Sequence, residues 1–240
     1  MINVLDHGFV RLVSYTQPAE HDEMRQSMDD FDSRSRQWTG DLEVVRNARA
    51  SYDTDWRTGD DTGKDEKLVN YLYKNKHTSP FEAMVFTFEI KAPIFVIRQW
   101  HRHRTWSYNE VSARYTELPE EFYVPPALYE QGQGNKQMSA DKVITSNEMF
   151  LKEMEYQNTQ AFNLYHCMLK AGVSRELART VLPLSTYSRF FGTVNLHNLF
   201  KFCSLRLHPH AQPEIQVYAQ ALLDLVKPIC PIAVQAFEEN

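Results

Sequence analysis

The sequence has few cysteines and few glycines, and each shortage excludes a class of protein. Its three cysteines, Cys167, Cys203 and Cys230, are widely spaced and form no CxxC pair. Neither a disulfide framework nor a thiolate metal site is expected, and a reducing cytoplasm is the expected location. With only eight glycines, the chain contains neither GxGxxG nor GxxxxGK[ST]. A Rossmann nucleotide site and a P-loop are therefore both unsupported.

Long apolar runs and an excess of positive charge are also missing. Residues 1–14 read MINVLDHGFVRLVS, in which Asn3, Asp6 and His7 interrupt the apolar side chains, and no later run reaches bilayer length. The sequence thus predicts neither a signal peptide nor a membrane span, and no membrane partner. A net charge of −5 with a pI near 6.0 argues against nucleic acid as a partner of the whole chain.

What is present is the composition of an ordinary globular protein, with 42% hydrophobic and 24% charged residues, which supports a sizeable core. The simplest interpretation is one α+β domain over residues 1–240, with residues 15–40 as a possible insertion. The expected strands and helices are set by side-chain periodicity. Strands are expected at 84–90 and 187–194, a strand or hairpin at 2–13, helices at 41–51, 141–170, 195–206 and 213–226, and a helix that runs into a loop at 94–104.

Two local signals refine this pattern. Ser79, Pro80, Phe81 and Glu82 have the signature of a capping box, with Ser79 as the N-cap. Residues 53–64 mix acids with glycines and are expected to form a loop.

The most unusual segment is residues 98–115, RQWHRHRTWSYNEVSARY, which sets four arginines and two histidines against the single acid Glu110. Arginines held close together repel one another by about 1 kcal/mol per pair at roughly 4 Å in water, and by more when desolvated. A bound anion removes that penalty, and guanidinium groups fit phosphate oxygens two at a time. Trp100, Trp106 and Tyr108 are candidates for stacking on a planar ring, although packing in the core is an equal alternative for Trp106. The segment therefore predicts a nucleotide or dinucleotide site.

Other interpretations of this segment remain open. A solvated basic face is the common fate of a charge run, although these arginines alternate with Trp, Ser, Asn and His and not with Glu and Lys. A second alternative is a module that binds single-stranded nucleic acid by stacking and charge. A third is a nucleotide-binding flavoprotein that is unrelated to the family resembled by the motif described next. On a helix, Gln99 and Arg102 share a face, so that Gln99 can contact a base edge while Arg102 reaches a phosphate.

Arg102, His103 and Arg104, followed by seven residues and Ser112, form the RHRx7S signature. On this motif the chain resembles the flavin-dependent thymidylate synthases, and further blocks extend the resemblance over residues 41–237. These blocks are residues 77–82, 92–96, 98–100, 114–115, 175–179, 181–184, 189–191, 195–206, 210–212 and 214–216. The resemblance implies the α+β fold of the thymidylate synthase-complementing proteins, with a small antiparallel sheet and several long helices.

The resemblance also implies an activity. The chain would be a methyltransferase that converts dUMP to dTMP, with 5,10-methylenetetrahydrofolate as carbon donor and NADPH as hydride source through FAD, without a Cys nucleophile. A homotetramer with flavin sites shared between subunits is implied as well. Arg206 is the expected catalytic residue, because a guanidinium beside the N3–C4=O edge of uracil loads electron density onto C5.

The binding residues are carried over from the resemblance position by position. The flavin contacts it implies are His77, Ser79, Arg102, His103, Arg104, Glu110, Asn195, His197 and Lys201. The dUMP contacts it implies are Gln99, Trp100, His101, Arg102, Glu110, Val111, Ser112, Ala113, Arg114, Arg179 and Arg206. His197 stands where some members have Arg, and Lys201 where some have Asn or His. No metal is expected, since His101-x-His103 and His208-x-His210 lack the carboxylates of a hydrolytic site.

Overall fold

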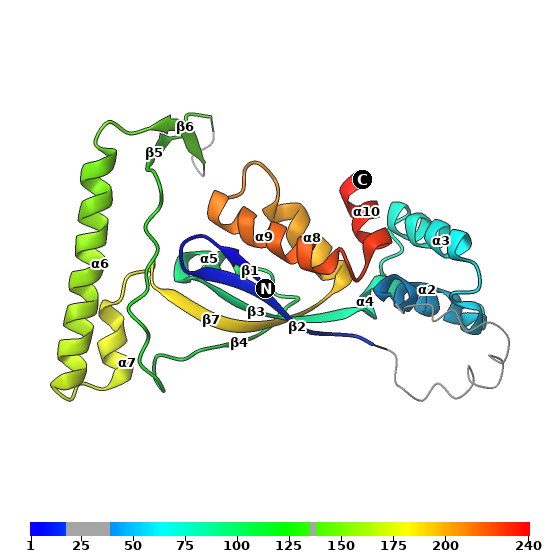
Figure 1. Cartoon of the computed structure of the whole chain (residues 1–240), viewed down its shortest axis with the longest axis horizontal. Coiled ribbons are helices and arrows are strands. Elements are labelled where there is room, and N and C mark those ends of the chain that lie inside the picture. Colours follow the sequence, from blue (N-terminus) through cyan, green and yellow to red (C-terminus); the bar gives the residue numbers. More distant parts are fainter. Residues whose placement is uncertain (18–38, 135–137) are drawn as a thin grey trace.

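A computed structural model describes residues 1–17, 39–134 and 138–240, and its centre is a five-stranded antiparallel sheet of order β1-β2-β3-β7-β4 (Figure 1). Neighbouring strands pair in antiparallel register, with Phe88 opposite Gly192 and Glu89 opposite Phe191. Most of the possible insertion at 15–40 lies outside the described residues. The strands are β1 Ile2–Val4, β2 Gly8–Tyr15, β3 Val85–Pro93, β7 Tyr187–Asn195 and β4 Ser107–Glu110.

Helices cover one face of this sheet (Figure 1). Phe86, Phe88 and Ile90 alternate along β3 and are fully buried on that side, as the period of a strand requires. The Tyr218 hydroxyl of the covering helix α9 donates to the Lys91 carbonyl at 2.8 Å. The covering elements are α5 Ile94–Trp100, α8 Leu196–Arg206 and α9 Pro213–Val226, while α10 Pro231–Glu239 packs against α3 beside them.

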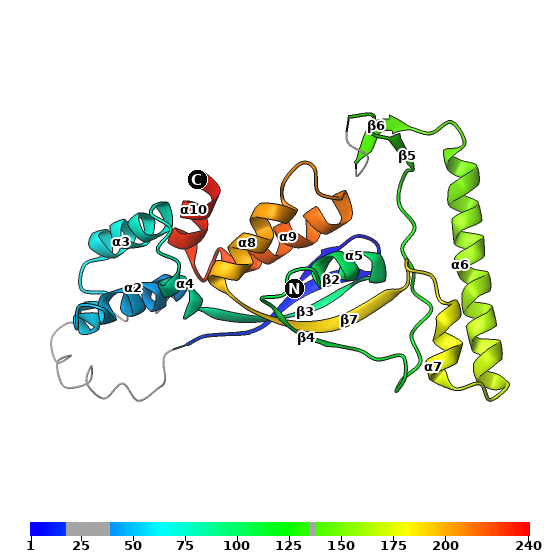
Figure 2. The ribbon, with the colours of Figure 1, turned by 180° about the vertical axis from the view of Figure 1, so that it is seen from behind.

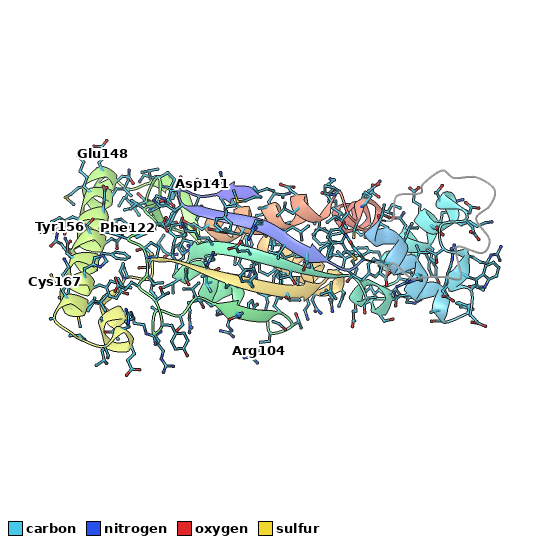
Figure 3. The ribbon with its side chains drawn as sticks, turned by 60° about the horizontal axis from the view of Figure 1, so that its bottom comes forward. Arg104, Phe122, Asp141, Glu148, Tyr156 and Cys167 are labelled. Carbon is cyan, nitrogen blue, oxygen red and sulfur yellow. The ribbon has the colours of Figure 1, made fainter. Side chains whose placement is uncertain are left out.

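The opposite face of the sheet carries charge, and Figure 3 shows it with the strands in front of α8 and α9. Glu89 is buried there between two half-exposed arginines. Its carboxylate accepts from Arg11 Nε at 2.7 Å and from Arg189 Nη1 at 3.0 Å. The buried acid is therefore paired on both sides, as a desolvated charge must be.

A group of helices forms one end of the elongated molecule. Asp41, at the start of α2, accepts from the backbone N–H groups of Ile232 and Ala233, both at 2.9 Å. Because those two groups belong to the first turn of α10, Asp41 caps that helix and fixes it against α2. The elements at this end are α2 Gly40–Ala50, η1 Asp55–Arg57, α3 Thr62–Lys74 and α4 Ser79–Glu82.

The opposite end is an arm that stands away from the sheet (Figure 2). Its small core contains Phe162, Tyr165 and Ala178, and Phe122 stacks on Phe162 with ring centroids 6.1 Å apart. We call residues 147–181 the α6–α7 arm. The elements at this end are β5 Tyr129–Gln131, β6 Ser139–Val143, α6 Asn147–Lys170, α7 Arg175–Ala178 and η2 Arg179–Val181.

The predicted α+β class is confirmed, and most predicted helices and strands lie where expected. The capping box is wrong: Thr78 is the N-cap of α4, Ser79 is its first residue, and no side chain caps it. The loop expected at 53–64 contains η1 and the first residues of α3. The helix expected at 141–170 begins only at Asn147, because the residues before it form β6.

Candidate active site

The arginine-rich segment begins where α5 ends. The helix stops at Trp100 with His101 as its C-cap, so Arg102 follows the helix and does not share a face with Gln99 as predicted. The Tyr108 hydroxyl from β4 lies 3.0 Å from the Trp100 carbonyl and 2.8 Å from the His103 carbonyl. The hydroxyl has one proton and donates to one of the two carbonyls at a time, and each carbonyl also accepts a backbone N–H, Trp100 from His103 and His103 from Trp106. These contacts connect β4 to the turn that carries residues 101–104.

Arg206, the expected catalytic residue, is the last residue of α8 and lies against this turn. Its Nε donates to His103 Nε2 at 2.9 Å and its Nη2 donates to the Gln99 carbonyl at 3.2 Å. We call Gln99, His103, Tyr108 and Arg206 the Arg206 network. The two hydrogen bonds restrict the guanidinium to one orientation before any ligand arrives.

His103 is held as a neutral hydrogen-bond acceptor. Burial, followed by the positive charges of Arg206 and Lys201, lowers the pKa of His103 to about 4. Its Nε2 lone pair therefore stays available to Arg206 near neutral pH. The His103 ring packs edge-on against Phe202 with centroids 4.7 Å apart, which fixes the position of the acceptor.

Two of the aromatic residues expected to stack on a ligand are instead part of the core. Trp100 is 0% exposed and stacks on Phe202, with ring centroids 4.7 Å apart. Trp106 is 5% exposed and packs against Trp100 and Phe202. Stacking on a ligand is therefore wrong for Trp100, and of the two alternatives open for Trp106 the structure supports packing, because neither ring offers a free face. Tyr108 is half-buried, with its ring parallel to that of Trp106.

Gln99 and His101 also have partners within the chain. The Gln99 side-chain amide donates to Gln212, the N-cap of α9, so it is not free to contact a base edge in this arrangement. The His101 ring lies 4.6 Å from that of Tyr108. His101 Nε2 is buried and finds no hydrogen-bond partner among the described residues. Gln99 therefore connects α5 to the start of α9, and the His101 ring packs against Tyr108 of β4.

Arg102 and Arg104, the two arginines of the signature, are exposed. Among the described residues no hydrogen bond or ion pair engages either guanidinium group. Figure 3 shows Arg104 at the edge of the sheet body, far from Tyr156 and Cys167 on α6. Both arginines are therefore available to an anionic ligand.

The next part of the signature follows β4 toward the arm. Glu110 accepts from Ser188 Oγ at 2.6 Å, and the Val111 N–H donates to the Arg189 carbonyl at 2.8 Å. Val111 continues the pairing with β7, so the backbone here is extended and held at the sheet edge. The carboxylate of Glu110 is exposed, apart from its Ser188 contact.

Residues 112–114 and Arg179 lie beside the arm. Ser112 Oγ accepts from the Arg114 N–H at 3.3 Å, and Ala113 is buried. The Arg114 guanidinium lies 3.8 Å from Glu176 on α7, and Arg179 caps the C-terminus of the same helix. Arg179 is exposed, and within the described part of the chain its guanidinium has no hydrogen bond or ion pair. A second group of expected dUMP contacts thus gathers near α7, apart from Arg206.

Several expected flavin contacts surround a cavity of about 440 Å³ at the other side of α8, which we call the His77 pocket. Asn195 caps α8 by accepting from the Asn198 N–H at 2.9 Å and does not line the cavity. Ser79 lies next to the lining residue Thr78. None of the described lining residues is Asp or Glu. The basic lining residues are Lys74, Lys76, His77, His197 and Lys201, and the aromatic ones are Tyr73, Phe81 and Phe200.

Sequence reasoning missed Lys74 and Lys76 of this pocket and the contact of Gln212 with Gln99. The two lysines had a signal, because YKNKH at 73–77 is a basic run directly before His77. Gln212 had none, since it is remote in sequence and meets Gln99 only through the packing of α5 and α9.

Two other chemistries receive little support from the geometry. No three His, Cys, Asp or Glu side chains among the described residues gather where they can hold a metal ion. Cys203 is 0% exposed, and burial raises the pKa of its thiol, which opposes thiolate formation.

In the described ranges no helix combines the length and apolar character needed to cross a membrane.

Comparison with known proteins decides the family. Residues 35–232 match the family described as thymidylate synthase complementing protein. The chain belongs to this family. Two relatives of the chain are flavin-dependent thymidylate synthases. That of Thermus thermophilus is 44% identical over 100% of this chain and 78% of its own length. That of Thermotoga neapolitana is 42% identical over 98% of this chain and 93% of its own.

A solved structure agrees with this membership. A UMP/dUMP methylase, PolB from Streptomyces cacaoi, bound with 5-Br dUMP, superposes with a TM-score of 0.80 at 33% identity. The match covers 99% of this chain and 97% of that one. The family fold expected from the signature is therefore confirmed along nearly the whole chain.

Proposed function

We propose that the protein is a flavin-dependent thymidylate synthase, a methyltransferase that converts dUMP to dTMP. In this proposal 5,10-methylenetetrahydrofolate supplies the carbon and NADPH supplies the hydride through FAD. The observation that carries the proposal is the Arg206 network, in a chain whose relatives are named flavin-dependent thymidylate synthases. A single guanidinium is oriented in advance by His103 and Gln99, next to two arginines open to anions.

Arg206 performs the activation of the pyrimidine. With its N–H donors aimed at the N3–C4=O edge of uracil, the guanidinium stabilises negative charge on O4 and increases electron density at C5. One such donor can contribute about 3–4 kcal/mol to a transition state. His103 and Gln99 reduce the cost of orienting the group, because they fix it before substrate binds.

The dUMP phosphate and sugar require further positive charge. Arg102 and Arg179 are exposed and carry free guanidinium groups within the described residues, and Ser112 and Arg114 offer additional donors. The remaining expected contacts, from Glu110 to Ala113, position this strand edge beside the ligand. Trp100 and His101 contribute by their backbone and by packing, because the Trp100 ring is buried.

The residues present also fit a flavin dinucleotide. The His77 pocket has the size that encloses one ring system or a drug-sized ligand, and its basic lining suits a phosphorylated coenzyme. His77, Ser79, Asn195, His197 and Lys201 would hold the coenzyme on that side, and Arg102, His103, Arg104 and Glu110 on the other. When bound, the flavin supplies the hydride that the methylene carbon requires.

A thiol-free reaction is consistent with the three cysteines. Cys203 and Cys230 are fully buried, and burial raises the pKa of both thiols. Cys167 is exposed but lies on α6, away from the sheet body (Figure 3). Within one chain, therefore, none of the three offers an exposed thiol beside Arg206.

We further propose a homotetramer with sites shared between subunits, in the cytoplasm, each subunit forming one domain over residues 1–240. Arg206 ends α8 over the sheet, whereas Arg179 caps α7 on the arm, and Figures 1 and 2 both show these helices far apart. If one dUMP contacts both arginines, a second copy of the chain supplies one of them. Met149, Tyr156 and Leu164 on α6 are more than half exposed, as expected for a surface that contacts another subunit.

The test of the reaction is NADPH oxidation measured with and without dUMP and methylenetetrahydrofolate. We expect a yellow protein, the colour of bound oxidised flavin, whose NADPH oxidation is coupled to dTMP formation only when both substrates are present. A colourless protein that binds oligonucleotides with strong salt dependence would instead support the nucleic-acid alternative.

The test of site sharing is a mixture of two variants, assayed at a dUMP concentration well below the wild-type KM, where a raised KM lowers the rate as a lowered kcat does. Arg206→Ala and Arg179→Ala are each expected to be impaired, and hybrids formed by refolding them together regain activity in about a quarter of sites if each site takes one arginine from each of two subunits. Absence of any regain, with hybrids demonstrated by mass spectrometry, would contradict sharing.

A further inference from the structure

Lys76 has a backbone conformation that is unfavourable for residues with a Cβ atom. Its φ is +57°, in the left-handed region, at the position directly after Asn75, the C-cap of α3. The Lys76 N–H donates to the Tyr73 carbonyl at 3.0 Å and the His77 N–H to the Leu72 carbonyl at 2.9 Å. This pair of bonds is the Schellman motif, in which the left-handed position is usually Gly because a Cβ there crowds the following carbonyl.

The same residue lines the His77 pocket, together with Lys74, His77, His197 and Lys201. No described lining residue has an acidic side chain, and the last residue, Asn240, also lines the pocket. Among the described residues the Lys76 ammonium makes no hydrogen bond or ion pair. Like charges gathered around one cavity repel one another unless an anion enters it. Strained backbone that persists beside a cavity is typical of functional sites.

We propose that Lys76 binds an oxyanion of a coenzyme in the His77 pocket. This contact explains why a lysine stands at a turn position that favours glycine. This inference rests on the proposed function for the identity of the coenzymes. The shared chemistry is a phosphate or carboxylate group, which FAD, NADPH and the glutamyl tail of the folate all carry.

A simpler explanation is that Lys76 is a cation placed at a helix C-terminus, where the helix dipole favours it. Lys74 already occupies the last turn of α3. The two explanations differ in what removal of the side chain does. If Lys76 interacts only with the helix dipole, Lys76→Gly leaves coenzyme binding unchanged. If Lys76 binds an oxyanion, Lys76→Gly weakens coenzyme binding while it relieves the backbone strain at residue 76.

The experiment compares Lys76→Gly and Lys76→Arg with the wild type, and uses Lys67→Gln as a control for net charge, since Lys67 is exposed on α3 and does not line the pocket. Thermal unfolding is measured with and without FAD, and the backbone strain is assessed from the FAD-free protein, because a bound ligand raises Tm by an amount that falls as its Kd rises. We expect Lys76→Gly to raise Tm by about 2–4 °C, because Gly relieves the left-handed strain. Lys76→Arg and Lys67→Gln should not raise it.

Affinity is measured for three probes on the same variants. These are the Kd of FAD by flavin fluorescence, the KM of NADPH against that of NADH, and the KM of mono- against triglutamyl methylenetetrahydrofolate. Lys76→Gly should weaken one of them about three- to tenfold, as expected for one charge-assisted contact. Lys76→Arg should restore it, and Lys67→Gln should leave all three unchanged.

The affected probe identifies the source of the oxyanion. Weaker FAD binding identifies the flavin phosphates, a loss confined to NADPH identifies its 2′-phosphate, and a loss confined to the triglutamyl folate identifies carboxylates. The inference is overturned if all three probes are unaffected in Lys76→Gly, or if Tm falls. A wild type that binds FAD through Lys76 but makes no dTMP would reject the proposed reaction and leave this contact standing.

Discussion

Arg206 and Arg179 are both expected dUMP contacts, yet the fold treats their guanidinium groups in opposite ways. Arg206 is half-buried and held by His103 and Gln99 within the same chain. Arg179 is exposed at the end of α7, where no described hydrogen bond or ion pair engages its side chain. A donor that must meet developing charge benefits from being fixed in advance, whereas one that only binds a phosphate can be ordered by the ligand.

This contrast predicts different kinetic signatures for the two arginines. Loss of a group that acts in the transition state lowers kcat, and loss of a group that binds substrate and transition state equally raises KM. The predictions below test that division, and the last one tests a residue that belongs to neither class.

The largest effect is expected for Arg206→Lys. Lysine keeps the charge but cannot donate through a planar fork to His103, Gln99 and the uracil edge together. We expect kcat to fall about 100- to 1000-fold, the loss typical of one oxyanion-type donor, with flavin binding retained. Steady-state assays with measured flavin occupancy check this, and Arg57→Ala, an exposed arginine in η1, is the control. A loss of less than tenfold would remove Arg206 from its catalytic role.

The second prediction concerns His103, the acceptor that orients Arg206. Glutamine can place its Oε1 near the position of Nε2, whereas asparagine is too short, so His103→Gln should keep most of the activity that His103→Asn loses. For the asparagine variant we expect kcat to fall about 10- to 100-fold, corresponding to a hydrogen bond to a charged group.

A double-mutant cycle separates orientation from simple structural damage in His103→Asn. If His103 acts through Arg206, the asparagine change should cost little more in an Arg206→Lys background, because residues that act as a unit are not additive. Fully additive losses would show that His103 acts independently, through the flavin or through folding.

Much of this site follows from the sequence, for physical reasons that differ by residue. The RHRx7S spacing identifies the turn after α5, because clustered guanidinium groups with one acid are unusual in a chain of net negative charge. The sequence cannot show that Trp100 and Trp106 are buried, since packing and ligand stacking both use aromatic rings. That distinction depends on Phe202 and Phe190, which reach these rings only through the fold.

The helix end after α5 is a second example of what local pattern cannot show. Gln99 and Arg102 have helical spacing, but the hydroxyl of Tyr108, from a neighbouring strand, meets the carbonyls of Trp100 and His103 and the helix stops. For α4 the Ser-Pro-Phe-Glu pattern is compatible with two starting residues, because proline is tolerated throughout the first turn. The chain begins that helix one residue earlier than the capping box predicts.

The third prediction applies to Arg179. If it binds the dUMP phosphate from a neighbouring subunit, Arg179→Ala should raise the KM for dUMP about tenfold, in line with the loss of one charged contact, and leave kcat nearly unchanged. Arg175→Ala is the matched control on the same helix, because its guanidinium lies 3.7 Å from Glu117 in an exposed pair. A drop in kcat without a change in KM would place Arg179 in the chemistry and erase the contrast with Arg206.

The smallest effect on turnover is expected for Cys203→Ala. Cys203 lies on α8, three residues before Arg206. Because the other class of thymidylate synthase uses a thiolate, this position makes Cys203 a candidate nucleophile. Its thiol is fully buried, with Sγ 3.8 Å from the Ala219 carbonyl, and burial raises its pKa. We expect kcat per folded subunit to change by no more than about twofold, while the lost sulfur costs about 1 kcal/mol of stability. Complete loss of turnover in a variant with an unchanged circular dichroism spectrum and full flavin occupancy would require a thiol in the reaction. In that case Arg206 would be positioned to stabilise a cysteine thiolate and not the uracil.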